Sequence, residues 1–263
     1  MKYKTKVIIT AGFDKSSFAV CVAELLQRKD VSVEGIVVVN PFAFKRVVNT
    51  VRKKGVNFIL EAIPRLIGKI GMVEDDYSPL KEFQRDEEIE FNSLKKWAHA
   101  NNVSYTLVPS INHIRSEQFI KNKKPNYLIY GGGGIIRSNI IDAVDGNILN
   151  AHLGPLPEIR GMNAIEWSVL LNERNEITIH FIDHGIDTGK IVKSYPMQIE
   201  KGDTIEVIRE KAKVKGVEGL VDAVSNNLIG KANLKENTDS YRQCFILSNT
   251  MKELLKSKLQ NFK

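Results

Sequence analysis

The sequence predicts a doubly wound, Rossmann-like α/β fold with a mostly parallel sheet, helices on both faces and a short C-terminal appendage. Two short apolar runs, at 7–10 and 33–39, flank a segment of helical periodicity, which is typical of the β-α-β unit that opens a parallel sheet. A third apolar run, at 125–130, leads directly into four glycines, Gly131 to Gly134. Exposed backbone at the carboxyl end of a parallel strand is where open α/β sheets bind ligands. We therefore expect a ligand site at this edge of the sheet.

Hydrophobic periodicity and capping residues predict the individual elements. Ser16 or Ser17 is expected to cap the first helix, and Asp203 or Thr204 is expected to begin a long one. Residues 177–182 alternate as a half-buried strand does. The remaining expectations are strands at 105–108, 125–130 and 195–199, and helices around 93–99, 116–121, 203–224 and 251–259.

A helical, basic insertion is expected at about 43–95. Apolar residues recur at helical spacing from Phe44 to Ile70. Residues 41–70 also carry seven lysines and arginines against a single acidic residue, Glu61. Such a patch favours a phosphate-bearing substrate or an anionic surface, and a solvated helix face explains it equally well.

The composition is that of an ordinary globular protein in a reducing compartment. Hydrophobic residues make up 43% of the 263 residues, charged residues 26%, and the formal net charge is +7. The chain has no apolar run long enough for a membrane-spanning helix and no signal-peptide core at its start. Its two cysteines, Cys21 and Cys244, suggest neither a disulfide framework nor a metal site. We expect a cytoplasmic protein without a metal.

The side chains with the clearest catalytic potential lie in residues 147–192. Asn150 and His152 end an apolar run two residues apart, so in an extended segment they point to the same face and can converge on one substrate atom. A second apolar strand then opens into a polar loop that carries Asp187. An amide, an imidazole and a carboxylate at strand ends suit acyl transfer to an amine.

These motifs resemble those of the folate-dependent formyltransferases, a family that includes glycinamide ribonucleotide, methionyl-tRNA and nucleotide-sugar formyltransferases. The resemblance extends roughly from Val7 to the 220s, with 43–95 matching least. It rests on Asn150-x-His152, a proline-containing turn that ends in Arg160-Gly161, Thr178-x-His180 and Asp183-x-Gly185-x-Asp187-Thr188-Gly189.

The resemblance implies transfer of a formyl group from N10-formyltetrahydrofolate to a primary amine. Asn150 would donate to the developing oxyanion, His152 would accept the amine proton, and Asp187 would hold His152 or an ordered water. Taken singly, the three could instead be a turn cap, a satisfied core histidine and a loop cap. The folate would contact Gly133, Gly134, Ile135, Ile136, Ile182, Asp183 and Asp187.

Gly12, Arg160 and His180 are expected to contact the acceptor. For Arg160 the alternative is a role in setting the turn, and for His180 a role in supporting the loop. Loop solvation is the alternative for Asp183 and its neighbour His184.

The acceptor is inferred from what the chain lacks. With a catalytic domain expected at 1–225, the appendage at 226–263 is shorter than the second domain of tRNA-directed relatives, and Gly12 stands where glycinamide ribonucleotide enzymes carry a richer phosphate loop. A nucleotide-linked amino sugar is therefore the first expectation, with the basic 41–70 segment as a candidate for its phosphates. Glycinamide ribonucleotide and methionyl-tRNA are the alternatives. We expect a small-molecule partner, no nucleic acid and no membrane span, with a homodimer as a possible assembly.

Two interpretations from other functional classes stay open. A non-catalytic protein that binds folate or a nucleotide would fit the unusual all-glycine loop, and the intact triad argues against it. An RNA-binding protein would fit the basic charge, but no aromatic stacking platform accompanies that charge.

Overall fold

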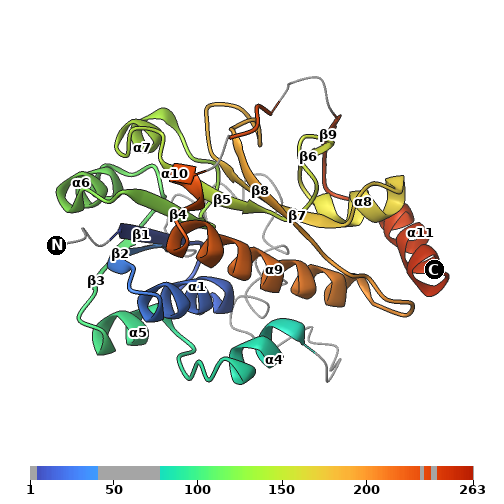
Figure 1. Ribbon diagram of the computed structural model, residues 1–263, viewed down its shortest axis with the longest axis horizontal. Helices are drawn as coiled ribbons and strands as arrows, with labels where there is room; N and C mark the ends of the chain where they lie inside the picture. Colours follow the sequence, from blue (N-terminus) through green and yellow to red (C-terminus); the bar gives the residue numbers. More distant parts are fainter. Residues whose placement is uncertain (1–4, 41–77, 232–233, 238–241, 263) are drawn as a thin grey trace, which may run out of the picture.

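A seven-stranded sheet forms the centre of the molecule in a computed structural model that describes residues 5–40, 78–231, 234–237 and 242–262 (Figure 1). The strand order is β3-β2-β1-β4-β5-β7-β8. The strands are β1 (Lys6–Ala11), β2 (Ser32–Val39), β3 (Ser104–Val108), β4 (Tyr127–Gly131), β5 (Ile148–His152), β7 (Glu176–Phe181) and β8 (Ile191–Pro196). The basic segment 41–70, and most of the insertion expected at 43–95, lie outside the described residues.

The sheet is mostly parallel. Strands β3, β2, β1, β4 and β5 pair in parallel, whereas β7 is antiparallel to both β5 and β8. The order reverses direction between β1 and β4, and doubly wound sheets bind ligands in the crevice at such a point. The predicted Rossmann-like α/β fold is confirmed.

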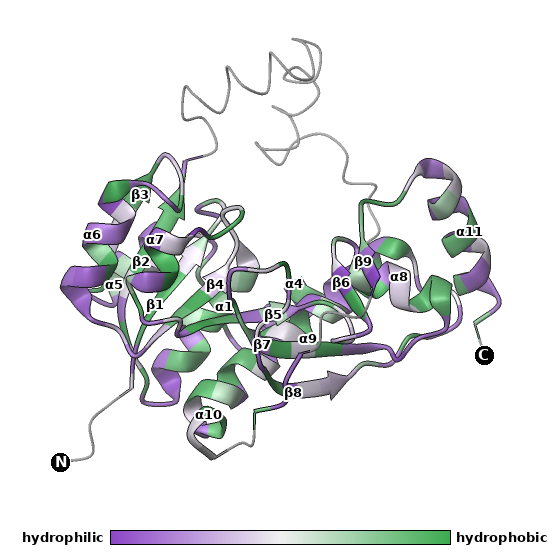
Figure 2. Ribbon diagram, turned by 90° about the horizontal axis from the view of Figure 1, so that it is seen from above, coloured by the Kyte–Doolittle hydropathy of each residue, from purple (hydrophilic) through white to green (hydrophobic). Residues whose placement is uncertain are grey.

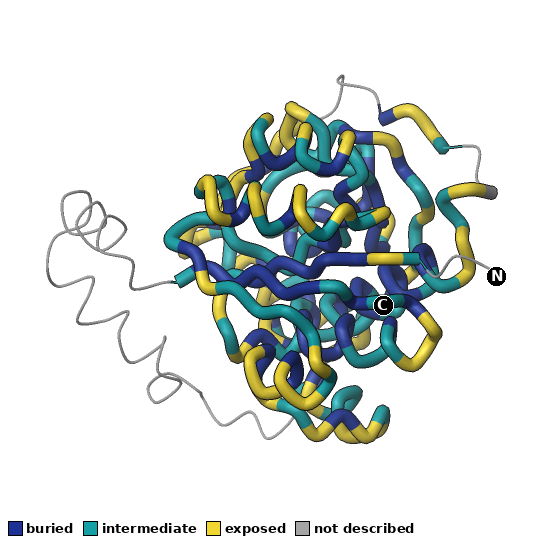
Figure 3. Tube along the Cα trace, turned by 90° about the vertical axis from the view of Figure 1, so that its left-hand side faces the viewer, coloured by how far each residue is buried: buried dark blue, intermediate teal, exposed yellow. Residues whose placement is uncertain are grey.

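Helices cover both faces of the sheet, as buried parallel strands require. Ile9 of β1 packs into a core cluster with helices α1 (Ser17–Arg28), α4 (Pro79–Asp86), α5 (Leu94–Ala100) and α9 (Ile205–Ser225). Its neighbour Ile8 points to the other face and packs with α6 (Ile114–Lys123) and α7 (Ser138–Asp142). Figure 3 shows the result, with buried strands between helices whose outer sides are exposed.

The predicted helix starts are largely correct. The Ser16 side chain accepts a hydrogen bond from the Ala19 amide and caps α1, and Thr204 caps α9 through the Val207 amide. Asp203 instead forms a salt bridge with Lys211. Three short helices in the described part of the chain escaped prediction, namely α7, α8 (Ala164–Leu171) and α10 (Leu228–Lys231), whereas α4 lies inside the helical insertion expected at 43–95.

Two strand predictions were wrong in detail. The strand expected at 195–199 runs from Ile191 to Pro196, because the register with β7 uses the residues before the predicted run. Strand β7 is buried on both faces and is not half-buried: Thr178 is 0% and His180 1% exposed. Thr178 Oγ1 and His180 Nε2 form hydrogen bonds inside the protein, whereas His180 Nδ1 is buried with no partner among the described residues.

The C-terminal residues pack against the segment that follows β5. Strand β9 (Arg242–Cys244) pairs in parallel with β6 (Ile159–Gly161), and helix α11 (Asn249–Gln260) packs on α8 and on the start of α9. Figure 2 shows these elements together at one end of the molecule, opposite α6 and β3. The expected domain boundary at residue 225 stays a prediction. Among the described helices, none is both long enough and apolar enough to cross a membrane.

Candidate active site

Strand β5 carries Asn150 and His152 on one face, at its carboxyl end. In the antiparallel pairing with β7, Asn150 lies opposite His180 and His152 opposite Thr178. The Asn150 amide nitrogen Nδ2 lies 3.0 Å from His180 Nε2. The i, i+2 spacing read from the sequence therefore brings an amide and an imidazole to the same side of the sheet, with a second imidazole across the strand pair.

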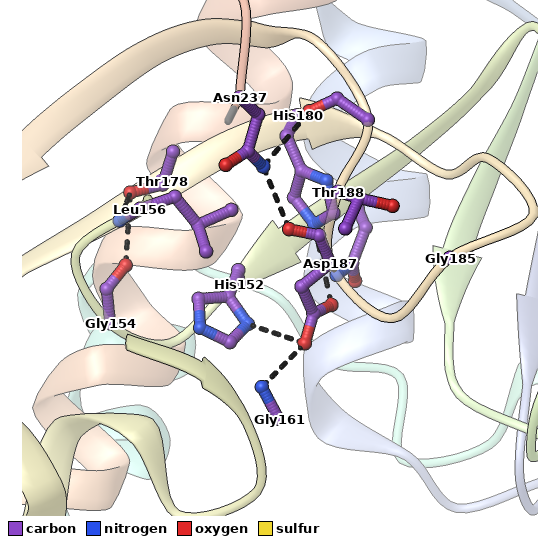
Figure 4. A network of polar contacts seen from close by, with 12 residues as sticks. His152, Gly154, Leu156, Gly161, Thr178, His180, Gly185, Asp187, Thr188 and Asn237 are labelled. Carbon is purple, nitrogen blue, oxygen red and sulfur yellow. Dashed lines mark hydrogen bonds and ion pairs between the residues drawn. The ribbon is translucent and has the colours of Figure 1, made fainter. Parts of the chain in front are cut away.

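Hydrogen bonding fixes the ring of His152. Its Nε2 donates to the carbonyl oxygen of Ile159 at 2.8 Å, and the side chain is only 5% exposed. Since a carbonyl can only accept, Nε2 carries the proton, and Nδ1 is the atom directed at Asp187, 3.5 Å from its Oδ2 (Figure 4). His180 meets this ring edge to face, with centroids 6.1 Å apart.

The Asp187 carboxylate lies between the other polar groups of the site. Its Oδ2 accepts the Gly161 amide at 2.8 Å, and its Oδ1 lies 3.7 Å from His180 Nε2. Its backbone has a φ of 52°, in the left-handed region that asparagine and aspartate tolerate better than most residues. The carboxylate is therefore held by one backbone donor and lies within reach of two imidazoles.

Burial keeps His180 neutral. The pKa of His180 is lowered to about 4, chiefly by desolvation and then by the neighbouring His152, while the Asp187 carboxylate opposes the shift. A neutral imidazole can accept the Asn150 amide hydrogen at Nε2 without competing for a proton from solvent.

The turn after His152 is anchored to β7. Thr178 Oγ1 accepts the Leu156 amide at 3.1 Å and donates to the Gly154 carbonyl at 2.9 Å. The Leu156–Pro157 peptide bond is cis. The threonine of the Thr178-x-His180 motif thus holds the turn that returns Ile159 to the His152 ring.

Two adjacent cavities open beside these side chains. One, of about 350 Å³, is lined by Asn150, His152 and Asp187 and also by Glu166 and Arg209. The other, of about 500 Å³, shares Asn150, Ala151, Leu153 and Lys213 with the first and extends to Phe13, Lys15, Phe18, Lys81, Tyr130 and Gly132. The two cavities adjoin at these shared residues, and we refer to them together as the cleft, whose lining runs from the catalytic candidates to the start of α1.

A buried ion pair forms part of the cleft wall. Glu166 is 2% exposed, and its Oε1 accepts from Arg209 Nε at 2.5 Å and from Asn163 Nδ2 at 2.7 Å. The terminal amino groups of Arg209 form no hydrogen bond with any residue that the structure describes. One turn along α9, Lys213 pairs with Glu210 and lines both cavities.

The predicted folate residues lie on two neighbouring loops, after β4 and after β7. Gly134 accepts the Tyr130 hydroxyl, Ile136 is buried with Ile182 packed near it, and Ile135 is 73% exposed. Asn112 stabilises the loop after β4, because its side chain donates to the Ile135 carbonyl and accepts from the Arg137 amide. The two loops approach each other where Ser138 Oγ lies 3.4 Å from His184 Nδ1.

The other predicted site residues differ in their surroundings. Asp183 binds its own loop, since its Oδ1 accepts from the Gly185 amide and from the Thr188 hydroxyl. Gly12 lies against the backbone of Gly133, where β1 and β4 end. Arg160 lies on β6 between Ile159 and Gly161, which form hydrogen bonds with His152 and Asp187 respectively. His180 contacts Asn150 and Asp187 and is almost fully buried, so it lies behind the cavity wall.

The fold also brings together atoms of the kind that bind metals. His152, His180 and Asp187 each place one possible ligand atom within 4.8 Å of the other two. Among the described residues, these three form the one group that could hold a metal ion. This grouping could not be predicted from the sequence, because the three residues do not have the spacing of a metal-binding motif. Two of the three atoms already contact Asn150 or a carboxylate oxygen, and the absence of a metal stays a prediction.

Several cleft residues were missed from the sequence. Asn163 and Glu166 have the three-residue separation of a helix capping pair, which could have suggested their contact. Arg209 and Lys213 are four apart on α9, which predicts a shared helix face. Nothing in the sequence indicates that Asn237 contacts the Asp187 loop.

Comparison with known families gives one match to a family model. The model, described as "Formyl transferase", matches residues 92–224. Among curated relatives, the methionyl-tRNA formyltransferase of Clostridium tetani is 25% identical over 72% of this chain and 61% of its own length. That of Bacteroides thetaiotaomicron is 25% identical over 66% of this chain and 55% of its own. The chain thus spans little more than half the length of these relatives.

Solved structures share the fold at low sequence identity. A phosphoribosylglycinamide formyltransferase from Bacillus halodurans has a TM-score of 0.55 at 18% identity, covering 87% of this chain and 98% of that one. A sugar N-formyltransferase from Shewanella sp. FDAARGOS_354 has a TM-score of 0.57 at 12% identity, covering 98% and 88%. The formyltransferase PseJ from Anoxybacillus kamchatkensis, solved with a UDP-linked formamido sugar and tetrahydrofolate, has a TM-score of 0.50 at 19% identity, covering 63% and 91%.

Proposed function

Because the chain belongs to the formyl transferase family, we propose that it transfers the formyl group of N10-formyltetrahydrofolate to a primary amine. The observation that carries the proposal is the convergence of Asn150, His152 and Asp187 on one wall of a cavity. In the reaction the amine nitrogen attacks the formyl carbon, the bond from that carbon to N10 breaks, and N10 gains a proton while the amine loses one. The site must therefore stabilise an oxyanion and move a proton.

Asn150 suits the first task. Its Nδ2 carries two hydrogens, and His180 Nε2 takes one of them at 3.0 Å. The second hydrogen is available to the formyl oxygen as negative charge develops there. Removal of one such preorganised donor typically costs roughly 10²–10³ in kcat.

His152 and Asp187 suit the second task. With Nε2 bonded to Ile159, His152 can accept a proton only at Nδ1, which lies 3.5 Å from the Asp187 carboxylate. The imidazolium that forms would be stabilised by that charge, and the carboxylate lies on the cavity wall, where it can also orient a water between amine and imidazole.

The folate is proposed to bind at the loops after β4 and β7. Three glycines there, Gly132 to Gly134, have φ between 99° and 127°, which larger residues rarely adopt. Gly134 and Ile135 are exposed at this loop, and Ile135, Ile136 and Ile182 supply apolar surface for a flat heterocycle.

A nucleotide-linked amino sugar is the proposed acceptor. The 500 Å³ cavity combines aromatic side chains, Phe13 and Phe18, with Lys15 and Lys81, a combination that suits a base and phosphates. Arg209 adds a guanidinium whose terminal amino groups have no partner among the described residues and can bind oxyanions or hydroxyls near the reacting amine. The curated relatives are methionyl-tRNA formyltransferases, so methionyl-tRNA is the second candidate. A cytoplasmic location and a homodimer stay predictions.

The test is an acceptor panel with matched variants. Wild-type protein is incubated with N10-formyltetrahydrofolate and nucleotide-linked amino sugars, glycinamide ribonucleotide or methionyl-tRNA, and both tetrahydrofolate release and product mass are followed. We expect Asp187→Asn and His152→Ala to lower kcat by at least about 10²-fold. Asp145→Asn is the control, because Asp145 has nearly the same positive φ but is exposed and lies outside the cleft.

The possible outcomes distinguish an error in the proposed activity from an error in the residues assigned to the site. If wild-type protein formylates no member of the panel, formyl transfer to these amines is refuted. If it does so and Asp187→Asn is as active as Asp145→Asn, the assignment of the site is wrong although the activity stands.

A further inference from the structure

The C-terminal residues reach the candidate active site at three points. Asn237 Nδ2 donates to the backbone carbonyls of Asp187 at 2.7 Å and Gly189 at 3.2 Å (Figure 4). Lys235 and Ile191 exchange backbone hydrogen bonds of 2.9 and 3.0 Å, which hold the same loop at its far end. Strand β9 pairs with β6, whose Gly161 amide binds the Asp187 carboxylate.

The orientation of Asn237 is determined by its partners. Both hydrogens of Nδ2 are used by carbonyl oxygens, and the flipped amide would direct Oδ1 at those same oxygens. The residue is 9% exposed, and its Oδ1 has no partner in the described part of the chain. An unpaired buried acceptor costs free energy, so the contribution of Asn237 at this position comes from the two hydrogen bonds that its Nδ2 donates.

The held backbone is itself in an uncommon conformation. Asp187 has a φ of 52°, and such a conformation persists only where the surrounding structure specifies it. The two carbonyls that Asn237 binds flank Thr188, immediately after Asp187. Loss of these bonds would free the loop to turn the carboxylate away from His152.

We infer that Asn237 is a positioning residue, which fixes the main chain of the Asp187 loop and so directs the carboxylate at His152. The catalytic unit then includes residues 234–237 and 242–244 and does not end near residue 225. The effect on rate rests on the proposed function, whereas the effect on the loop does not.

The first test needs no substrate. Asn237→Leu keeps a similar volume but removes both donors, and amide hydrogen exchange is measured by NMR in the full chain. We expect the Gly161 amide to exchange about tenfold faster or more, as a weakened hydrogen bond to Asp187 would produce. The neighbouring Met162 amide, which donates to Cys244, is the internal control and should not change.

Two further variants, a control and a milder substitution of Asn237, test whether the change in Gly161 exchange is specific. Lys235→Ala removes an exposed side chain from the same segment and leaves its backbone pairing intact, so Gly161 exchange should stay at the wild-type rate. Asn237→Ser keeps one donor and should fold even if Asn237→Leu does not, with an intermediate effect. Unchanged Gly161 exchange in folded Asn237→Leu or Asn237→Ser would overturn the inference.

The second test measures the rate. Displacement of a catalytic group by about 1 Å can cost up to ~10²-fold, so kcat should fall on that order while KM for the amine acceptor changes little. In the Asp187→Asn background, Asn237→Leu should add no further loss. A full additional loss there, or a fall in active-site concentration with unchanged kcat per site, would show a merely structural role. An inactive wild-type protein would refute the proposed function and leave the exchange result standing.

Discussion

At the residue scale, His180 links the candidate site to the stability of the fold. It is 1% exposed, lies behind Asn150, and has a pKa lowered to about 4, chiefly by burial and then by His152. In the unfolded chain the same imidazole titrates near its ordinary value of 6.5. As the pH falls from about 6.5 towards 4, the unfolded state therefore binds a proton that the folded state does not, and stability is lost.

We predict that His180→Gln flattens this part of the pH profile. A difference of about 2.5 pKa units corresponds to roughly 3 kcal/mol, so the free energy of unfolding of wild-type protein should fall by up to that amount between about pH 7 and pH 4 because of this one residue. Urea unfolding at several pH values measures it. His99→Gln, which changes an exposed histidine, should keep the wild-type slope. Parallel slopes for wild type and His180→Gln would contradict the prediction.

The residues of the site differ in how far the sequence reveals them. The i, i+2 spacing of Asn150 and His152 dictates a shared face once the segment is a strand, so their convergence could be predicted. The contact of Asp187 with Gly161 and the burial of His180 depend on how β6 and β7 pack, and local spacing contains no such information. Asn237 lies 50 residues from Asp187 and has no motif around it.

At the element scale, helix α9 lies directly against the strands that carry the site. A β-carbon at Gly216 would lie 3.2 Å from the Ala151 side chain on β5, and one at Gly219 would lie 3.0 Å from Ile179 on β7 and Tyr195 on β8. The two glycines thus allow the helix to approach the sheet beside Asn150 and His152. The sequence predicted helix α9 correctly, but its hydrophobic periodicity does not show which face of the helix packs on the sheet.

We predict that Gly219→Ala destabilises the protein in spite of a better helix propensity. Alanine gains about 1 kcal/mol over glycine inside a helix. Overpacking against buried side chains costs about 1–3 kcal/mol, and Ile179 is fully buried while Tyr195 is bonded to Asp222. A net loss of about 1 kcal/mol is expected in urea unfolding. Gly230→Ala, in an exposed position near one flexible side chain, should be neutral or slightly stabilising, and the same result for both variants would refute the packing argument.

At the scale of the whole molecule, the question is whether the C-terminal residues fold with the sheet. Periodicity indicated helix 251–259 but could not show its partner, since an amphipathic helix fits any apolar surface. In the structure Leu255 and Leu259 are buried with Val169 of α8 and Ile208 of α9. Because α9 also packs on β5 and β7, the tail is connected to the candidate site through one continuous set of contacts.

If the C-terminal residues fold together with the sheet, a cavity made in helix α11 should lower the free energy of unfolding of the whole molecule. Leu255→Ala removes a fully buried side chain and should lower the free energy of unfolding by about 2–5 kcal/mol, whereas Leu254→Ala, 56% exposed and adjacent, should change it by less than about 0.5 kcal/mol. Two tryptophans report on separate regions, because Trp167 contacts the tail through the Phe245 carbonyl and Trp97 is buried in the core cluster around α1.

In a Trp97→Phe background the fluorescence of Trp167 reports unfolding near the tail, and in a Trp167→Phe background that of Trp97 reports unfolding of the core around α1. If the chain unfolds as one unit, Leu255→Ala shifts both urea midpoints equally, and the segment that contains Asn237 shares its stability with the strands that carry the candidate site. A shift seen by Trp167 alone would restore the boundary near residue 225 and separate the tail from the fold that supports the site.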